Sequence, residues 1–387
     1  MRLYSLRWLA IWITSGIFRS VLWELLLLHA GPARGKTNFV SFLGYWGCSW
    51  AALLFGVRKL NQPPFQFWRW SWSAIAGMLY LIVNDMVGSS IDYFAHINAG
   101  PLLFHIFHSS VVLFVAIFAV SILRASVTVS QWFGIVLVSG SILVTAVPAP
   151  LEAPGSFAIG LMAASVSNVF HALQYPVSQR ILSSDGIAKP CVEALALFES
   201  LLGTIVFTVW TLIYTVPRWH EVVYQPIMES PQPSISWAWF AYLSYIIVEG
   251  MHSLSFYFSI QQFGAVPVAV AKGLMISGGL IVVHVLFCGA DRTQCITYSH
   301  GSATTWSEIQ KPVAMVLSVS GVLIYNLCGH NVANFQSPHS NLATARETSH
   351  SFCQDGRYLE FIDSAGDGAP RHRQSESGRS GIPQSQL

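Results

Sequence analysis

The sequence has little charge. Asp, Glu, Lys and Arg make up only 10% of its 387 residues, whereas a soluble globular protein contains about 25% of them. Hydrophobic residues make up 53%, so the composition excludes an ordinary soluble domain and predicts a membrane protein. The 20 basic and 18 acidic residues nearly balance. Without a basic excess, the chain is not expected to bind nucleic acid.

Motifs for metal binding and catalysis are also lacking. The six cysteines show neither the spacing of metal ligands nor the density of a disulfide scaffold. Cys288 and Cys295 flank a short polar stretch, where a loop disulfide and two free thiols are both open. No nucleophile and base recur at catalytic spacing, and no nucleotide-binding loop is present. We therefore expect no enzyme, no metal and no cofactor.

Long apolar segments fill the first 330 residues. A helix that crosses about 30 Å of hydrocarbon needs about 20 mostly apolar residues. Ten segments meet this requirement and predict transmembrane helices, at 6–29, 38–57, 71–90, 100–123, 130–148, 156–177, 190–216, 236–260, 264–288 and 311–329. The connections are short except at 219–236 and 289–308, which leaves no room for a soluble catalytic domain. The first segment also fits a signal peptide, although Arg19 and Glu24 interrupt its apolar core.

The distribution of basic residues predicts that both termini lie in the cytosol. With the N-terminus there, that side collects eight Lys and Arg residues of the first 330 and the opposite side five, as the positive-inside rule requires. Residues 331–387 are rich in Ser, Gly, Gln, Asp and Arg. Such a composition predicts a disordered cytosolic tail.

Two predicted spans are similar in sequence. The segment GPLLFHIFHSSVVLFVAIFAVSIL (100–123) aligns with GAVPVAVAKGLMISGGLIVVHVLF (264–287) at an offset of 164, and the span that follows each of them matches as well. The second copy lies five spans after the first, an odd number, so it enters the membrane from the opposite side. We therefore predict an all-α polytopic membrane protein whose ten helices form a five-plus-five inverted repeat, with residues 1–150 as the first half and 151–330 as the second.

Several motifs in this arrangement are typical of a known family. They are the helix that begins QWFGIVLVSGSILV, the polar helix FHALQYPVSQRIL followed by VEALALFESLLG, and the closing GVLIYN. Between about residues 70 and 328 the chain resembles the drug/metabolite transporter superfamily. Its nearest likeness is to the eukaryotic solute-carrier branch that holds nucleotide-sugar transporters and chloroquine-resistance-transporter-like proteins.

The resemblance implies transport of a small molecule by alternating access, without ATP, in a lipid bilayer. It implies a polar organic metabolite, with a nucleotide sugar first and amino acids, peptides or amphipathic cations second. A multi-pass receptor or scaffold that does not transport is the alternative. The resemblance also implies an intracellular membrane, Golgi or endolysosomal, and leaves a homodimer open. Lys272 matches the basic residue that nucleotide-sugar transporters usually carry in the ninth helix.

Ionisable residues inside the predicted spans are the candidates for function. Each costs about 2.5–3.5 kcal/mol on insertion scales, so it must face the interior, find a partner or lie near an interface. Seven such residues are present: Arg19, Glu24, Asp85, Glu193, Glu199, Glu249 and Lys272. Two are basic and five are acidic, a balance that does not favour an anionic substrate. Glu193 lies near the start of its helix, where capping explains it.

The candidate substrate-binding residues lie on several spans. Lys272 is eight residues into a helix of small apolar residues, where it can bind an anionic group or form a permanent ion pair with Glu249 or Glu199. Polar side chains that share a helix face or match Lys272 through the repeat extend the set, which comprises Lys272, Asn168, His171, His108, Ser109, Arg19 and Tyr245. Hydrogen-bonded helix packing is the alternative role for these groups.

The candidate proton-coupling residues are Glu249, His252, Glu199 and Asp85. Tyr245, Glu249 and His252 fall at positions i, i+4 and i+7, which places them on one stripe of a helix. A buried carboxylate beside an imidazole is a suitable proton site. Interface exposure is the alternative for Asp85, and helix packing is the alternative for the Tyr245–His252 stripe.

Overall fold

The structure of the protein is a computed structural model. It describes residues 3–57, 65–99, 104, 107–108, 110–146, 155–183, 190–289 and 305–333. These residues belong to one compact unit, Met1–Phe335. The predicted tail, apart from the last residues of a helix that ends at Ala333, lies outside the described residues, as does Cys295 of the cysteine pair.

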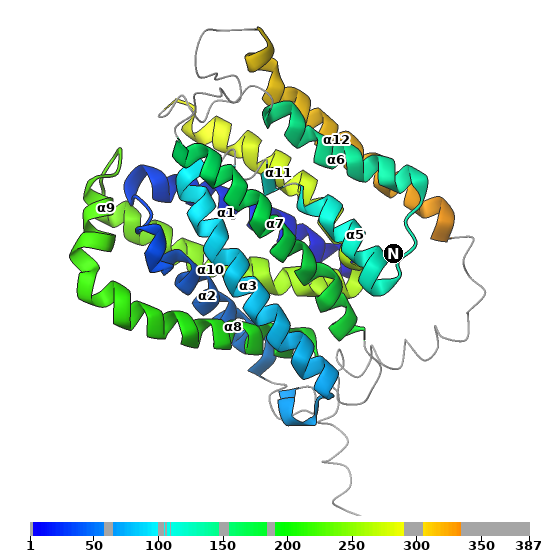
Figure 1. Ribbon diagram of the computed structural model, residues 1–387, viewed down its shortest axis with the longest axis horizontal. Helices are drawn as coiled ribbons and strands as arrows, with labels where there is room; N and C mark the ends of the chain where they lie inside the picture. Colours follow the sequence, from blue (N-terminus) through cyan, green and yellow to red (C-terminus); the bar gives the residue numbers. More distant parts are fainter. Residues whose placement is uncertain are drawn as a thin grey trace, which may run out of the picture. The chain divides into compact units, whose positions relative to one another are not determined.

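The described residues are α-helical and contain no strand, which confirms the all-α fold class (Figure 1). The long helices are α1 (Leu3–His29), α2 (Phe39–Gly56), α3 (Trp72–Ala99), α5 (Val111–Leu123), α6 (Val129–Ala146), α7 (Gly155–Leu182), α8 (Val192–Trp210), α10 (Ile235–Phe263), α11 (Ala265–Phe287) and α12 (Thr305–Ala333). Every predicted span overlaps one of them. The first part of the span predicted at 100–123 lies partly outside the described residues.

Two helical boundaries differ from the prediction. The span predicted to end at 90 continues to Ala99, because no proline interrupts it and Gly88, one of its two glycines, packs against Phe170 and His171 of α7. The connection predicted at 219–236 is helical over its first half. After α8 the chain runs through π-helical and 3₁₀ turns into the short helix α9 (Gln225–Met228).

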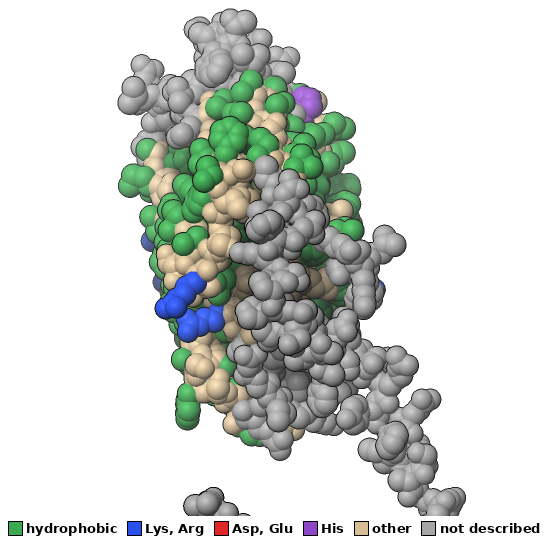
Figure 2. All heavy atoms as spheres, turned by 90° about the vertical axis from the view of Figure 1, so that its right-hand side faces the viewer, with side chains coloured by type: hydrophobic (Ala, Val, Ile, Leu, Met, Phe, Trp, Pro, Cys, Tyr) green, Lys and Arg blue, Asp and Glu red, His purple; other side chains and the backbone are tan. Residues whose placement is uncertain are grey.

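Helix length and surface chemistry fit a bilayer. Among the described residues, five helices are long and apolar enough to cross a membrane, within Leu6–His29, Phe39–Gly56, Trp72–Asn98, Val192–Arg218 and Ala265–Phe287. Large apolar side chains such as Leu54, Ile213 and Val285 remain at least 70% exposed, which is unusual for a soluble monomer. Figure 2 shows one face on which the described side chains are mostly hydrophobic, with a small group of Lys and Arg.

Glycines allow two pairs of helices to approach closely. A Cβ atom on Gly250 of α10 would lie 2.5 Å from the Gly47 carbonyl oxygen of α2, and one on Gly134 of α6 would lie 2.7 Å from the Gly321 carbonyl oxygen of α12. Small residues at such crossings let backbones pack in contact. Gly264 joins α10 to α11 with a φ of +87°, a conformation that favours glycine.

The packing places a cavity between two apolar clusters. One cluster includes Trp12, Tyr175 and residues of α5, α6 and α11. The other includes Trp23, Tyr245 and residues of α2 and α10. Trp12 and Tyr175 of the first cluster and Trp23 and Tyr245 of the second line the same internal cavity, so the cavity separates the two clusters.

Candidate functional site

The cavity has a volume of about 150 Å³ and gathers most of the ionisable side chains from the apolar helices. Four carboxylates, two cationic side chains and four imidazoles line it: Asp85, Asp92, Glu199, Glu249, Arg19, Lys272, His96, His108, His171 and His252. With neutral imidazoles the lining therefore carries two more negative than positive charges. Ionisable groups inside apolar helices mark functional sites in membrane proteins.

Lys272 on α11 is buried and contacts an imidazole. Its Nζ lies 2.5 Å from Nε2 of His108, and His108 Nδ1 lies 2.5 Å from Oδ1 of Asn168. The Asn168 amide nitrogen donates to the Phe107 carbonyl oxygen at 2.9 Å and to Ser110 Oγ at 2.7 Å. No carboxylate among the described residues lies within ion-pair distance of Lys272, so the ion pair with Glu249 or Glu199 is absent.

Arg19 on α1 pairs with Glu249 on α10, with 2.9 Å between Nε and Oε2. Tyr245 lies one turn before Glu249, and both side chains pack against Gly44 of α2. The contact explains how a charged residue is accommodated in the first apolar helix. It also joins α1 to α10, which pack along much of their length.

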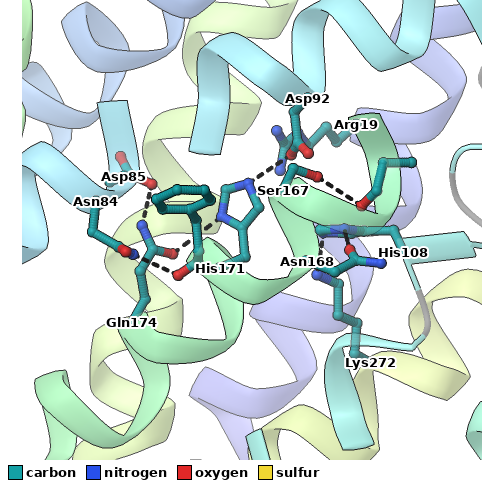
Figure 3. A network of polar contacts seen from close by, with 12 residues as sticks. Arg19, Asn84, Asp85, Asp92, His108, Ser167, Asn168, His171, Gln174 and Lys272 are labelled. Carbon is teal, nitrogen blue, oxygen red and sulfur yellow. Dashed lines mark hydrogen bonds and ion pairs between the residues drawn. The ribbon is translucent and has the colours of Figure 1, made fainter. Parts of the chain in front are cut away.

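A histidine–carboxylate contact joins α7 to α3. His171 Nε2 lies 2.7 Å from Oδ2 of Asp92, and His171 Nδ1 lies 3.4 Å from Oε1 of Gln174. The Gln174 amide nitrogen donates to Asp85, which also accepts a hydrogen bond from the Tyr45 hydroxyl. Figure 3 shows His171 between Asp92 and Gln174, with Lys272 directed toward His108 and Asn168.

The remaining candidates have separate contacts. Glu199 on α8 accepts a hydrogen bond from the Tyr257 hydroxyl of α10. His252 shares a helix face with Glu249, but its Nδ1 lies 3.2 Å from both the Trp12 carbonyl oxygen and Ser15 Oγ on α1. The imidazole and the Glu249 carboxylate therefore have different partners, although both line the cavity.

The cavity contains nine of the eleven candidate residues. Asn168 is fully buried and does not line the cavity. Its role is to hold the His108 ring through the contact with Nδ1. Ser109 lies outside the described residues. Of the two other charged residues in the predicted spans, Glu24 is buried in α1 away from the cavity, and Glu193 lies in the first turn of α8 as expected.

Sequence reasoning missed Asp92 and His96 because it ended the third span at residue 90. Asp85, Ser89, Asp92 and His96 are spaced at i, i+4, i+7 and i+11, and all four line the cavity. This spacing is one stripe of an α-helix. When this helical spacing is continued from Asp85 through the sequence DMVGSSIDYFAH, it predicts that both residues lie on the same helix face as Asp85.

Comparisons with known proteins bear on the fold alone. No family model and no curated protein matches the chain. Among solved structures 28 chains match. One of them, titled "Crystal structure of protein", has a TM-score of 0.56 and 13% sequence identity, and the match covers 82% of this chain and 98% of that chain. The helical arrangement described here therefore has a counterpart among solved structures.

Proposed function

We propose that the protein is a secondary transporter built as a ten-helix inverted repeat, in which the cavity holds a polar organic solute. The packing between helices supports the repeat. In this repeat α1, α2, α3, α5 and α6 would correspond in order to α7, α8, α10, α11 and α12. When each helix is replaced by its counterpart, most of the main packed helix pairs become other pairs that also pack in the structure. The contact of α1 with α10 becomes that of α7 with α3, and the contact of α1 with α11 becomes that of α7 with α5.

The contact between Lys272 and His108 gives independent support. Their separation of 164 residues equals the offset at which the sequences of the two halves align. Two residues related by a two-fold axis meet only where they lie next to that axis. The 2.5 Å contact is therefore expected if a pseudo-two-fold axis passes between α11 and the segment that precedes α5.

The contacts of Arg19 and His171 with carboxylates follow the same symmetry. Arg19 lies 16 residues after the start of α1 at Leu3, and His171 lies 16 residues after the start of α7 at Gly155. Arg19 reaches a carboxylate on α10 and His171 reaches one on α3, and these two helices correspond in the repeat. Inverted repeats of transporters place their solute site at such an interface.

The charges in the cavity favour the second of the expected solute classes. A nucleotide sugar is anionic, whereas the lining has four carboxylates against two cationic side chains. The volume of about 150 Å³ is also below the range of about 300–1,000 Å³ for sites that hold drug-sized ligands. We therefore propose a small amine or zwitterion such as an amino acid, with its amine near Asp85 or Glu199 and its carboxylate near Lys272.

Sidedness and location complete the proposal. Ten spans place both termini on one side, and the basic residues favour the cytosol. The family resemblance favours a Golgi or endolysosomal membrane. A homodimer within the bilayer is the candidate assembly.

Flux into liposomes tests the function. The purified full-length protein is reconstituted and screened with labelled amino acids, small peptides, organic cations and nucleotide sugars. We expect saturable uptake of an amino acid or cation that falls at least tenfold in Lys272→Ala and Glu249→Gln, and persists in Glu221→Gln, which alters an exposed carboxylate. Binding of a solute without any flux would replace transport with a receptor role. Flux that Lys272→Ala and Glu249→Gln leave unchanged would refute the site.

A further inference from the structure

His171 lies between the Asp92 carboxylate, at ion-pair distance, and the amide oxygen of Gln174. On one side, Nε2 lies 2.7 Å from the Asp92 carboxylate. At this distance the ring nitrogen and the carboxylate share a proton, which belongs on Nε2 because a carboxyl group is a stronger acid than an imidazolium. On the other side, Nδ1 lies 3.4 Å from Oε1 of Gln174.

The orientation of the Gln174 amide determines what Nδ1 carries. The amide nitrogen contacts Asp85, whose other carboxylate oxygen accepts from Tyr45. An ionised carboxylate only accepts hydrogen bonds, so the amide nitrogen belongs on the side of Asp85 and the amide oxygen faces His171. An amide oxygen is also only an acceptor. A proton on Nδ1 satisfies this contact as well, and with both nitrogens protonated the ring is an imidazolium.

His108, whose ring centroid lies 5.3 Å from that of His171, has the opposite environment. Its Nε2 faces the Lys272 ammonium, which only donates, and its Nδ1 faces Oδ1 of Asn168. The Asn168 amide is fixed in this orientation because its nitrogen donates to the Phe107 carbonyl oxygen. His108 is thus a neutral imidazole with its proton on Nδ1, and the two rings hold different protonation states.

We propose that His171 is the proton-binding site that couples the transport cycle to a proton gradient, in place of Glu249 and His252. The inference rests on the proposed transport function for its role and on the hydrogen-bond geometry for its location. Asp92 is the counter-ion, and the Gln174 amide changes its orientation when the proton leaves. The site lies in the cavity wall where α7 packs against α3.

The charges around His171 agree with an imidazolium. The charged groups around it or its counter-ion come from α1, α3, α10, α11 and the segment that precedes α5: Arg19, Asp85, Asp92, His108, Glu249 and Lys272. With neutral His108 these groups carry three negative and two positive charges. One proton on His171 brings the set to zero, which is the state that a low-dielectric interior favours.

Loss of this proton has a defined structural consequence. The Nδ1 proton leaves to the cavity, which His171 lines, because Nε2–H faces the Asp92 carboxylate. The Nδ1 lone pair then faces the Gln174 oxygen, and the repulsion turns the amide. Turning it breaks the hydrogen bond from Gln174 to Asp85, which frees one of the carboxylates proposed to hold the solute amine. The proton and the solute are linked through this bond.

Nitrogen NMR tests the proton site without requiring transport. Full-length protein labelled with ¹⁵N-histidine is placed in nanodiscs and titrated with base, and His171 is assigned by its loss in His171→Gln. We expect both ring nitrogens of His171 to be protonated at neutral pH and one to lose its proton as the pH rises, while His108 shows one bare nitrogen throughout. A neutral His171 at every pH would overturn the proposal.

Flux under a pH gradient tests the coupling. One pH unit is worth 1.36 kcal/mol, so coupling to one proton gives about tenfold solute accumulation. We expect this accumulation in the wild type and in His220→Gln, whose histidine is exposed. In His171→Arg and His171→Gln we expect none, although His171→Arg keeps the charge and the contact to Asp92 and so controls for folding. Accumulation in His171→Arg would refute the coupling role. A titrating His171 in a protein without any flux would support the proton site and refute the proposed transport.

Discussion

The Arg19–Glu249 ion pair is predicted to couple α1 to α10 energetically. Removing one partner of a buried pair costs about 3–5 kcal/mol, because it leaves the other charge unpaired. The side chains here are 32% and 13% exposed, and water in the cavity screens the charge, so we expect the lower end, about 3 kcal/mol, for Arg19→Gln and for Glu249→Gln. The double variant leaves no charge behind. We expect it to cost less than the two single changes together by about 2 kcal/mol, within the range for residues in contact.

The assay is reversible unfolding in mixed micelles, followed by tryptophan fluorescence, for the wild type, both single variants and the double variant. A matched control exists in the same chain. Arg34 and Glu221 lie 3.1 Å apart, but their side chains are 53% and 59% exposed, and exposed pairs contribute about 0–1 kcal/mol. Additive effects at Arg19 and Glu249, or a coupling no larger than that at Arg34 and Glu221, would refute the reasoning.

Two further stability predictions concern α6 and α11. Gly134→Ala should lower the free energy of unfolding by about 1–3 kcal/mol, because the new methyl group meets the Gly321 carbonyl oxygen; Gly140→Ala on the same helix, where nothing lies within 4 Å, should be neutral or stabilising. Equal thermal unfolding midpoints for the two variants would contradict this account of the α6–α12 contact. Lys272→Met should raise the free energy of unfolding by about 1–3 kcal/mol while abolishing flux, because it removes a buried ammonium whose described partner is His108. A destabilised Lys272→Met would show that the ammonium serves the fold.

Much of the site could be predicted from sequence because charge is so scarce in these helices. A lysine in a helix of valine, alanine and glycine has to face inward, and Lys272 does. Glu249, His252 and Asp85, which are candidates because they are polar residues inside apolar spans, also line the cavity. The predicted spans overlap the helices for a similar reason, since apolar runs of this length have few alternatives to a helix.

The partners of these residues could not be predicted. Arg19 reaches Glu249 across α1 and α10, and His171 reaches Asp92 across α7 and α3. Such contacts depend on how each helix is rotated and which helix it packs against, and a hydrophobic pattern that is nearly uniform around each helix specifies neither. For the same reason the sequence paired Glu249 with His252, which share a stripe but turn to different neighbours.

Access to Cys48 tests the central claim most directly. This natural cysteine on α2 lines the cavity, so a cavity that opens alternately to both sides should expose it to both. The measurement treats sealed right-side-out and inside-out vesicles with a membrane-impermeant thiol reagent and quantifies modification of the Cys48 peptide, with Cys48→Ser as the control. Alternating access predicts modification from either side and protection by the transported solute. Modification from one side alone would contradict the account.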